Sequence, residues 1–453
     1  MKLSAALRLS DLPRLALAGA GGKTSALFCL GRELLPAHPT VILTTTTHLG
    51  AWQVSAGDSH IIINAIQDCD RLAESPPGLI VVSGPLGDAR RYRGLTPPAL
   101  ERLLQHADEH GIPLLVEADG ARLLPLKAPA EHEPVIPEFV DSVLVCAGLN
   151  ALDQPLTAEW VHRPEQFARL SGLRPGEAIT PEALSRVLAH PQGGLKNIPP
   201  AARRVLLLNQ ADSAHKQAQA HAIAMQVQQA FHSVIIAALS CLPDGAVSGI
   251  EQSSPPAQLH AVHASIAGVI LAAGGASRYG QPKQLLAWQG QPMVRHVAQI
   301  VLQAGLAPVV VVTGAVADQV SAALGGLPVR LVNNPHWQSG QSTSLQAGLS
   351  ALPPTAGGVV FLLADQPNLS AALVQALVEE HSRTLAPIVA PLVDGQRANP
   401  VLFDPITFPD LIQVSGDMGG RQLFSKYPLR YVPWHDRAVL LDVDTPQDYE
   451  PPL

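Results

Sequence analysis

Residues 268–286 read GVILAAGGASRYGQPKQLL and carry the clearest signal in the chain. An apolar run typical of a buried strand leads into a turn whose glycines are Gly274, Gly275 and Gly280. Because glycine has no side chain, backbone N–H groups in such a turn can approach an anion closely. Ser277 adds a hydroxyl, and Arg278 and Lys283 add two cations. We therefore predict a loop that binds a nucleoside triphosphate.

The strand that enters this loop is one of many similar apolar runs. The runs of the first half are 15–20, 41–47, 61–64, 79–83, 113–117, 142–147, 205–209 and 234–239, and those of the second half are 268–273, 308–313, 329–333, 359–364, 388–392 and 429–432. Runs of this length without alternation suit strands that are buried on both faces. Because helix-like stretches separate them, the pattern predicts α/β folds with two doubly wound, mainly parallel sheets, the first P-loop-like and the second Rossmann-like.

The chain is too long for one ordinary core, since 453 residues correspond to two or three domains. The best boundary is the segment 249–264, GIEQSSPPAQLHAVHA, which contains Ser-Ser-Pro-Pro and shows little apolar periodicity. A new strand and a glycine-rich loop follow directly. We therefore expect one domain over residues 1–250 and a second over 266–453.

Composition limits the classes of function. The net charge of −7 argues against general affinity for nucleic acid, which needs clustered Lys and Arg. The four cysteines are scattered and do not suggest a zinc site or a disulfide framework. Neither a signal-peptide pattern nor an apolar run of membrane-spanning length is seen, so we expect a cytoplasmic protein that does not enter a membrane.

Two further segments of the second half offer carboxylates for a metal ion. In VVFLLADQPNL an apolar strand ends at Asp365, and the carboxyl ends of strands are where ligands bind in open α/β sheets. In VLLDVDTPQDY, Asp442 and Asp444 lie two residues apart on one face of an extended segment. Asp365 is predicted to hold Mg²⁺, and Asp442 is a candidate second ligand. Asp444 could equally cap the following turn.

The second half resembles the MobA-like nucleotidyltransferases, and within them the molybdenum cofactor cytidylyltransferase (MocA-type) branch. LAAGGASRYGQPK, NNPHWQSGQSTSLQAGL, ADQP, GQRANPVLF, SGDMGGRQLF and LDVDTPQD carry the resemblance, in the family's order and over about 190 residues. It implies transfer of CMP from CTP to Mo-molybdopterin with Mg²⁺ as cofactor and pyrophosphate as the second product. At the start of the glycine-rich loop, the guanylyl branch of the family has a sequence similar to LAGG, whereas this chain has Leu271-Ala272-Ala273-Gly274. This difference in the resemblance favours CTP over GTP. Tyr279 departs from the usual Met.

The resemblance also implies residue roles. Leu271, Ala272 and Ala273 would join the glycine turn in binding the nucleotide, and Arg278 and Lys283 would act with Asp365 in catalysis. The residues that match the part of the family's site where the acceptor binds are Gly340, Ser342, Ser344, Asn399, Pro400 and Asp417. Two alternatives stay open: a transferase that uses GTP or another phosphorylated acceptor, and a non-catalytic chaperone of the cofactor.

The first half contains a second phosphate-type loop. LALAGAGGKTS, residues 15–25, predicts a strand, a turn and a helix start, with Gly21, Gly22, Lys23 and Thr24 as nucleotide-binding residues. The full P-loop pattern fails because position 17 is Leu. PLLVEADGAR ends a strand with Glu117 and Asp119, a candidate pair for positioning Mg²⁺ or water. ATP or GTP with Mg²⁺ is the expected ligand.

This half resembles the YqeC family, described as accessory proteins of selenium-dependent molybdenum hydroxylases. GAGGKTS, TTTTHL, EADGARLLPLKAPAEHEPVIP, GLNALDQPL, HRPE, GGLKNIP and LLNQAD carry the resemblance over residues 10–245. In LLNQAD, Asp212 sits where GTPases place the aspartate that reads guanine, although Gln210 replaces their lysine. The resemblance implies service to an apo molybdenum hydroxylase of the xanthine dehydrogenase type.

Overall fold

The computed structural model describes residues 1–87, 91–239, 258–275, 282–417 and 419–440. The chain divides into two compact units, Met1–His263 and Ala264–Leu453. Each unit is built around its own sheet, and each is described by itself.

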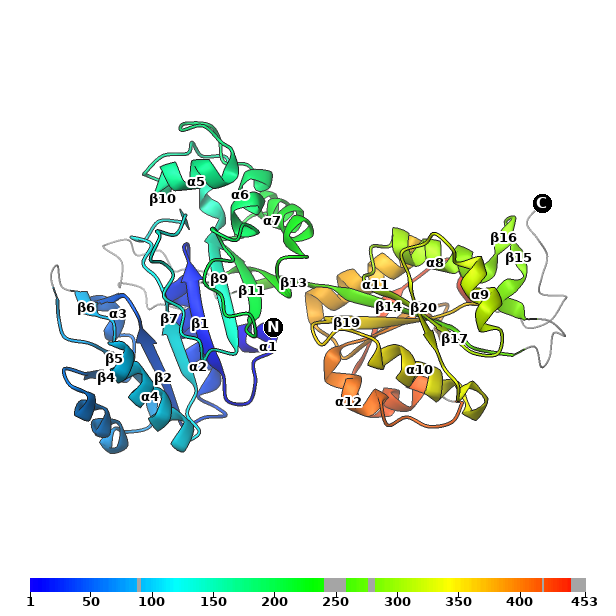
Figure 1. The fold of residues 1–453 in the computed structure, drawn as a ribbon, viewed down its shortest axis with the longest axis horizontal. Helices are drawn as coiled ribbons and strands as arrows, with labels where there is room; N and C mark the ends of the chain where they lie inside the picture. Colours follow the sequence, from blue (N-terminus) through cyan, green and yellow to red (C-terminus); the bar gives the residue numbers. More distant parts are fainter. Residues whose placement is uncertain (88–90, 240–257, 276–281, 418, 441–453) are drawn as a thin grey trace. The chain divides into compact units, whose positions relative to one another are not determined.

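The first unit is a nine-stranded sheet in the order β13-β12-β11-β9-β1-β7-β2-β5-β4. Its strands are β1 (Arg14–Gly19), β2 (Thr40–Thr45), β4 (Ser59–Ile62), β5 (Gly78–Ser83), β7 (Leu114–Glu117), β9 (Ser142–Gly148), β11 (Arg203–Asn209), β12 (Ser233–Ala238) and β13 (Gln258–Ala264). Its α-helices are α1 (Leu3–Leu7), α2 (Lys23–Leu34), α3 (Ala51–Val54), α4 (Pro97–Glu109), α5 (Pro164–Ser171), α6 (Pro181–Leu188) and α7 (Ala214–Val227). Short pairs flank the sheet: β3 (His48–Gly50) with β6 (Arg91–Arg93), and β8 (Leu126–Lys127) with β10 (Val161–His162) (Figure 1).

Strand β1 lies near the middle of this sheet and pairs in parallel with β7 on one side and β9 on the other. One core cluster joins β9 and β11 to α5, α6 and α7 through Phe167, Leu184 and Ile223. A second joins β2, β5 and β7 to α4 through Leu103. The side chains of the opposite face, such as Leu15 and Leu17 of β1, are also fully buried, and this apolar burial on both faces explains why the strands read as continuous apolar runs.

The second unit has an eight-stranded sheet in the order β18-β17-β14-β19-β22-β20-β21, with β23 beside β20. Its strands are β14 (Ile266–Ala272), β17 (Val309–Thr313), β18 (Arg330–Asn333), β19 (Gly358–Leu363), β20 (Ile388–Val393), β21 (Gln396–Arg397), β22 (Val401–Phe403) and β23 (Leu429–Pro433), with a separate hairpin of β15 (Ala287–Trp288) and β16 (Gln291–Pro292). Its helices are α8 (Met293–Gln303), α9 (Ala317–Ala323), α10 (Gln341–Ser350), α11 (Ala371–Thr384) and α12 (Phe408–Leu411), with 3₁₀ turns η4 (Lys283–Leu285), η5 (Trp337–Ser339) and η7 (Gly419–Ser425).

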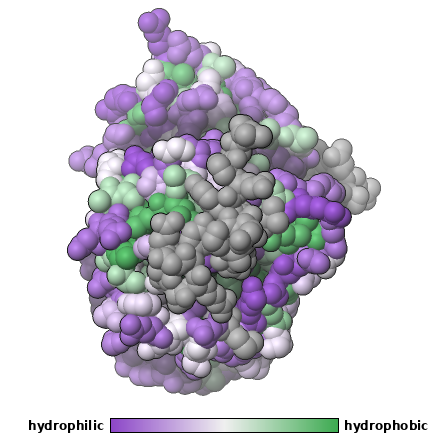
Figure 2. Space-filling model, turned by 90° about the vertical axis from the view of Figure 1, so that its right-hand side faces the viewer, coloured by the Kyte–Doolittle hydropathy of each residue, from purple (hydrophilic) through white to green (hydrophobic). Residues whose placement is uncertain are grey.

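Two layers of helices sandwich the second sheet. Helices α8, α9 and α11 cover one face, and α10 and α12 cover the other (Figure 1). The surface seen in Figure 2 is mostly hydrophilic with small hydrophobic patches, which fits an interior that holds most of the apolar side chains. Within the described residues, no helix combines the length and apolar character needed to cross a membrane.

The predicted fold class is confirmed, because both sheets are largely parallel and alternate with helices. One local prediction is wrong. Residues 258–264 were expected within the segment between the domains, but they form β13 at the edge of the first sheet. QLHAVHA contains two histidines and no long apolar run, and only Ala261 and Val262 are buried, which suits a strand at the edge of the sheet.

Candidate functional site

The candidate active site of the second unit lies at the carboxyl ends of β14, β17 and β19. Strand β14 pairs in parallel with β17 and with β19, so all three end at the same edge of the sheet. The chain turns to opposite sides of β14 to form these two neighbours, which makes this edge a topological switch point. A cleft of about 1300 Å³, partly open to solvent, lies there.

The glycine turn forms one wall of this cleft. The residues of the turn that line it are Leu271, Ala272, Ala273, Gly274 and Gly275. The buried amide of Gln284 donates from Nε2 to the carbonyl oxygens of Ala272 at 3.2 Å and of Gly274 at 3.0 Å. These bonds hold the end of β14 against η4, whose first residue, Lys283, also lines the cleft. The cation and the turn therefore share one wall.

Asp365 lies on the β19 side of the same cleft. It follows the strand by two residues, and the N–H of the preceding Ala364 donates to the carbonyl of Leu271 at 3.2 Å. Asp365 is partly exposed and lines the cleft together with Lys283. The structure thus brings the predicted carboxylate and the predicted cation to one cavity from segments about 80 residues apart.

Trp337 was missed by the sequence analysis and helps to shape the cleft. A Cβ added to Gly275 would meet its ring at 3.0 Å, and one added to Gly314 would meet it at 2.9 Å. Gly314 also faces Ala273, whose Cβ would lie 2.9 Å from such an added atom. The indole therefore packs where two glycines leave room. Trp337 lies within the quoted stretch 333–349. A large aromatic side chain in that stretch was the feature of the sequence that could have indicated its place in the cleft.

The start of α10 forms the far side of the cleft. Gly340 precedes the helix with φ of 109°, and a Cβ there would meet Asp417 Oδ1 at 2.9 Å. Asp417 accepts a hydrogen bond from the backbone N–H of Gln341 at 3.3 Å. Ser344 is buried, and its hydroxyl accepts from Asn334 Nδ2 at 2.9 Å. All four of Gly340, Gln341, Ser344 and Asp417 line the cleft.

A second cavity of about 830 Å³ adjoins the first. The two share Leu271, Gln341, Leu363 and Asp417 in their linings. The second cavity is also lined by the predicted residue Asn399 and by Arg397, Phe403, Arg421 and Phe424. These residues lie in the stretches GQRANPVLF and SGDMGGRQLF, which carry the family resemblance. The spacing of residues in the sequence does not show which of their side chains come together in the fold.

The other predicted residues of this unit fall into two groups. Ser342 is buried and its N–H donates to the carbonyl of Gly416, while Pro400 is buried; neither lines either cavity. Four predicted residues lie outside the described residues: Ser277, Arg278, Gly280 and Asp442.

The cleft suits a hard divalent cation. Asp365 supplies carboxylate oxygens at a cavity edge, and oxygen donors are what Mg²⁺ prefers. Mg²⁺ is normally held by one or two carboxylates together with substrate phosphates and water, so a dense protein cage is not required. This matches the described residues, among which no group of three His, Cys, Asp or Glu side chains is arranged to hold a metal ion.

The glycine turn of the first unit also forms a tight loop ahead of a helix. Gly21 and Gly22 have φ of 73° and 136°, a region that side chains disfavour. A Cβ on Gly22 would meet Asn209 Nδ2 at 2.1 Å, and the amide of Asn209 donates to the carbonyl of Gly21 at 3.0 Å. Asn209, at the end of β11, thus braces the loop. Helix α2 starts directly after it, at Lys23.

Lys23 is held inside the protein by two carboxylates. Its Nζ donates to the carbonyl of Gly19 at 2.6 Å and lies 3.1 Å from Asp119 Oδ1 and 4.0 Å from Glu117 Oε1. Burial lowers the pKa of Lys23, but Asp119 and Glu117 outweigh it, so the net pKa is raised and the amine stays charged. Burial raises the pKa of Glu117 to about 7 against the opposing charge of Lys23. Asp119, at 3.1 Å against 4.0 Å for Glu117, is the nearer of these two carboxylates to Lys23.

A chain of buried charges continues from Asp119. Lys127 Nζ donates to Asp119 Oδ2 and to Glu133 Oε2, both at 2.8 Å, and Arg163 Nη1 donates to the same Glu133 oxygen at 2.8 Å. Burial alone would raise the pKa of Glu133, but the hydrogen bonds from Arg163 and Lys127 lower it to about 2. Each cation of this chain contacts at least one carboxylate, and Asp119 and Glu133 are each shared by two cations.

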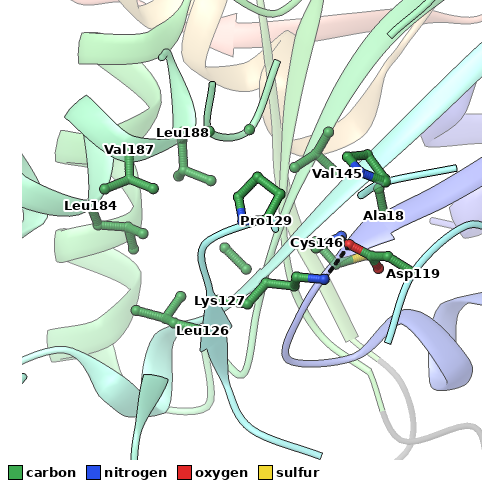
Figure 3. A pocket seen from close by; sticks show the side chains of 15 residues that line it. Ala18, Asp119, Leu126, Lys127, Pro129, Val145, Cys146, Leu184, Val187 and Leu188 are labelled. Atoms are coloured by element: carbon green, nitrogen blue, oxygen red, sulfur yellow. Dashed lines mark hydrogen bonds and ion pairs between the residues drawn. The ribbon is translucent and has the colours of Figure 1, made fainter. Parts of the chain in front are cut away.

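Figure 3 shows Lys127 reaching toward Asp119 from one side of a small pocket. Leu184, Val187 and Leu188 of α6 lie on the other side, so the ion pair borders an apolar space. Cys146 also lines this pocket, and burial raises the pKa of its thiol to about 12. The thiol therefore remains protonated and serves here as a small apolar group.

Asp212 does not join this loop in the described contacts. Its carboxylate pairs with Lys216 at 2.9 Å, four residues further on, and is more than half exposed. In the same motif Gln210 Oε1 accepts from the N–H of Asn150 at 3.2 Å. The contact of Asn209 with the loop was missed, as were Glu133 and Arg163. The quoted stretches 117–137 and 162–165 contained the last two, but not their pairing.

These features define two α/β domains, each with a glycine turn after a strand, and the second has its turn, a cation and a carboxylate at a switch-point cleft. Residues 268–434 match the MobA-like NTP transferase domain, and residues 15–165 match the YqeC protein family. The chain belongs to the YqeC family through its first part and to the MobA-like NTP transferase family, a family of nucleotidyltransferases, through its second.

Three relatives illustrate the two memberships. The uncharacterized protein YqeC of Escherichia coli is 37% identical over 195 residues, which are 42% of this chain and 73% of that protein. Nicotine blue oxidoreductase of Paenarthrobacter nicotinovorans is 35% identical over 40% of this chain and 92% of its own length. A probable molybdenum cofactor guanylyltransferase of Bacillus cereus is 27% identical over 40% of this chain and 93% of its own.

Proposed function

We propose that the second unit is a molybdenum cofactor cytidylyltransferase, which transfers CMP from CTP to Mo-molybdopterin and releases pyrophosphate. The first unit is a nucleotide-binding accessory domain for the maturation of molybdenum hydroxylases. The observation that carries the transferase assignment is the shared cleft, where Lys283 and Asp365 line the same cavity as the glycine turn at Gly274 and Gly275.

The reaction needs little from the protein beyond position and charge. An oxygen of the acceptor phosphate attacks the α-phosphorus of CTP, the bond from that phosphorus to the β-phosphate oxygen breaks, and pyrophosphate leaves with the bonding electrons. A phosphate dianion and CTP carry the same total charge as the dinucleotide and pyrophosphate, so no proton has to move. The protein therefore needs no general base or nucleophile of its own.

The residues of the cleft divide this work. Backbone N–H groups of the turn and Lys283 face the triphosphate, with Arg278, outside the described residues, as a proposed second cation. Mg²⁺, when bound, supplies positive charge to the phosphate oxygens, and Asp365 with Asp442 are the residues proposed to hold it. Gly340, Ser342, Ser344, Asn399, Pro400 and Asp417 are proposed for the acceptor side, where Ser342 and Pro400 would act by supporting the residues that line the cavities.

The choice of nucleotide rests on the turn. Ala273 contributes a methyl group beside Gly314, and Trp337 lies against the same glycine. Together with the sequence Leu271-Ala272-Ala273-Gly274 this supports CTP. A relative named as a probable guanylyltransferase makes GTP the second candidate.

The test is a single product analysis. Purified protein is incubated with Mo-molybdopterin, Mg²⁺ and either CTP or GTP, and the pterin product is identified by mass spectrometry. We expect the cytosine dinucleotide with CTP and little product with GTP. Formation of the guanine dinucleotide would instead identify GTP as the substrate. Binding of the cofactor without any product would favour a non-catalytic chaperone that delivers it to a hydroxylase of the xanthine dehydrogenase type.

For the first unit the proposed ligand is ATP or GTP with Mg²⁺. Two contacts of Thr24 support this role: its hydroxyl lies 3.4 Å from Glu117 Oε2 and accepts a hydrogen bond from Gln53 at 2.7 Å. Thr24→Val keeps the shape of the side chain and removes the hydroxyl. We expect nucleotide affinity in the presence of Mg²⁺ to fall about tenfold or more in equilibrium dialysis.

Thr96→Val is the matched control, because the Thr96 side chain forms no capping hydrogen bond on α4. It should bind both nucleotides like the wild type. Equal affinities of wild type and Thr24→Val for both nucleotides would contradict the assignment of this loop.

A further inference from the structure

The second cavity of the transferase unit contains two arginines that have no carboxylate partner among the residues that the structure describes. Arg397, from β21, and Arg421, from η7, both line it. Within the part of the chain that the structure describes, neither guanidinium forms an ion pair. Most other arginines of this unit behave differently, as Arg383 and Arg430 do, which both pair with Glu380. Two unmatched cations at one cavity favour an anionic ligand.

The electrostatics of Arg397 point the same way. Burial lowers its pKa, and the positive charge of Arg421 lowers it further. The protein therefore holds two like charges close together in a partly desolvated place, which costs free energy in the absence of a ligand. A bound anion would remove this repulsion.

The wall beside these arginines is aromatic. The guanidinium carbon of Arg397 lies 4.2 Å from the ring centroid of Phe424, a cation–π contact. The Phe424 ring stacks on that of Phe403 at 6.3 Å and 12°, and Phe403 meets Phe361 edge to face at 5.9 Å. Flat surfaces from three separate elements thus line one cavity. Such surfaces bind conjugated rings by stacking.

From this arrangement we infer that the second cavity is a specificity subsite for acceptors that combine a planar conjugated ring with a phosphate. Arg397 and Arg421 bind the anion, and the Arg397–Phe424 stack accepts the ring. Asn399 and Asp417 provide an amide and a carboxylate for the polar edge of a heterocycle. The inference rests on the proposed function, because it makes this cavity the acceptor side of the transferase.

The position of the subsite fits a transfer reaction. Its lining shares Leu271, Gln341, Leu363 and Asp417 with the cleft that contains Lys283 and Asp365. An acceptor seated against Phe424 therefore lies beside the proposed nucleotide site. Acceptors without a ring, such as polyol phosphates, would find the anion site but no stacking surface.

Binding measurements test this independently of turnover. The probes are a fluorescent pterin phosphate, glycerol phosphate as the anion without a ring, and CTP with Mg²⁺. The variants are Arg397→Lys, which keeps the charge but loses the planar fork, Arg421→Lys, and Phe424→Leu, which keeps apolar bulk but loses the ring. We expect each variant to bind pterin phosphate about tenfold more weakly than the wild type and to bind CTP unchanged. Wild type should prefer pterin phosphate to glycerol phosphate about tenfold or more.

The control is Arg383→Lys, an exposed arginine on α11 that should change none of these affinities. Urea unfolding of every variant checks that the fold is kept. Wild-type-like binding of pterin phosphate by all three variants overturns the inference, as does an equal loss of CTP binding or equal affinity for the two phosphates. If these affinities behave as expected but no nucleotide is transferred, the subsite stands and the proposed transferase function fails.

Discussion

Asp365→Asn is expected to lower kcat/KM for nucleotidyl transfer about 100- to 1,000-fold, because the variant keeps the shape of the side chain but removes the charge proposed to hold Mg²⁺ at the cleft. The measurement is pyrophosphate release at varied Mg²⁺ with the nucleotide and acceptor fixed. A shift of the Mg²⁺ dependence to higher concentration should accompany the loss. Pterin phosphate binding should not change, since Asp365 does not line the second cavity.

Asp394→Asn is the matched control for this substitution. Asp394 is an exposed aspartate at the β20–β21 turn that pairs with Arg437, away from both cavities. It should retain full activity. Transfer at the wild-type rate by Asp365→Asn, with an unchanged Mg²⁺ dependence, would remove the carboxylate from the mechanism and with it the main support for the proposed cleft.

Lys23→Met is expected to destabilise the first unit by about 3–5 kcal/mol, because it removes one of the two cations that balance the buried carboxylate of Asp119 and leaves only Lys127 beside it. The side chains of Lys23 and Asp119 are only 4% and 2% exposed, so water cannot replace the lost charge. Urea unfolding of the full chain, followed by hydrogen exchange of peptides covering β1 (Arg14–Gly19), measures this unit. Peptides covering β14 in the second unit should unfold as in the wild type.

Two variants complete this experiment. Lys216→Met removes a lysine from the exposed pair with Asp212 and should cost about 1 kcal/mol or less. Lys23→Met combined with Asp119→Asn removes both charges and should recover part of the lost stability. Equal effects of Lys23→Met and Lys216→Met would mean that the buried pair adds nothing beyond a surface contact.

Much of the fold could be read from local sequence. Apolar runs such as 142–147 and 359–364 predict buried parallel strands because both faces of the sheet are covered. The turns at Gly21 and Gly274 follow strands and carry nearby cations, so both loops were found without a structure. Strand β13 was missed because its two histidines break the apolar pattern that marks the central strands.

The sequence by itself determined the two loops and the carboxylate at the end of β19, because a strand, a glycine turn and a charged residue follow one another within a few positions. Only the tertiary structure decided which distant side chains meet. Arg163 reaches Glu133 across 30 residues, and Arg397 lies over Phe424 across 27. Those contacts depend on the order and register of strands, which long-range packing sets and local spacing does not encode.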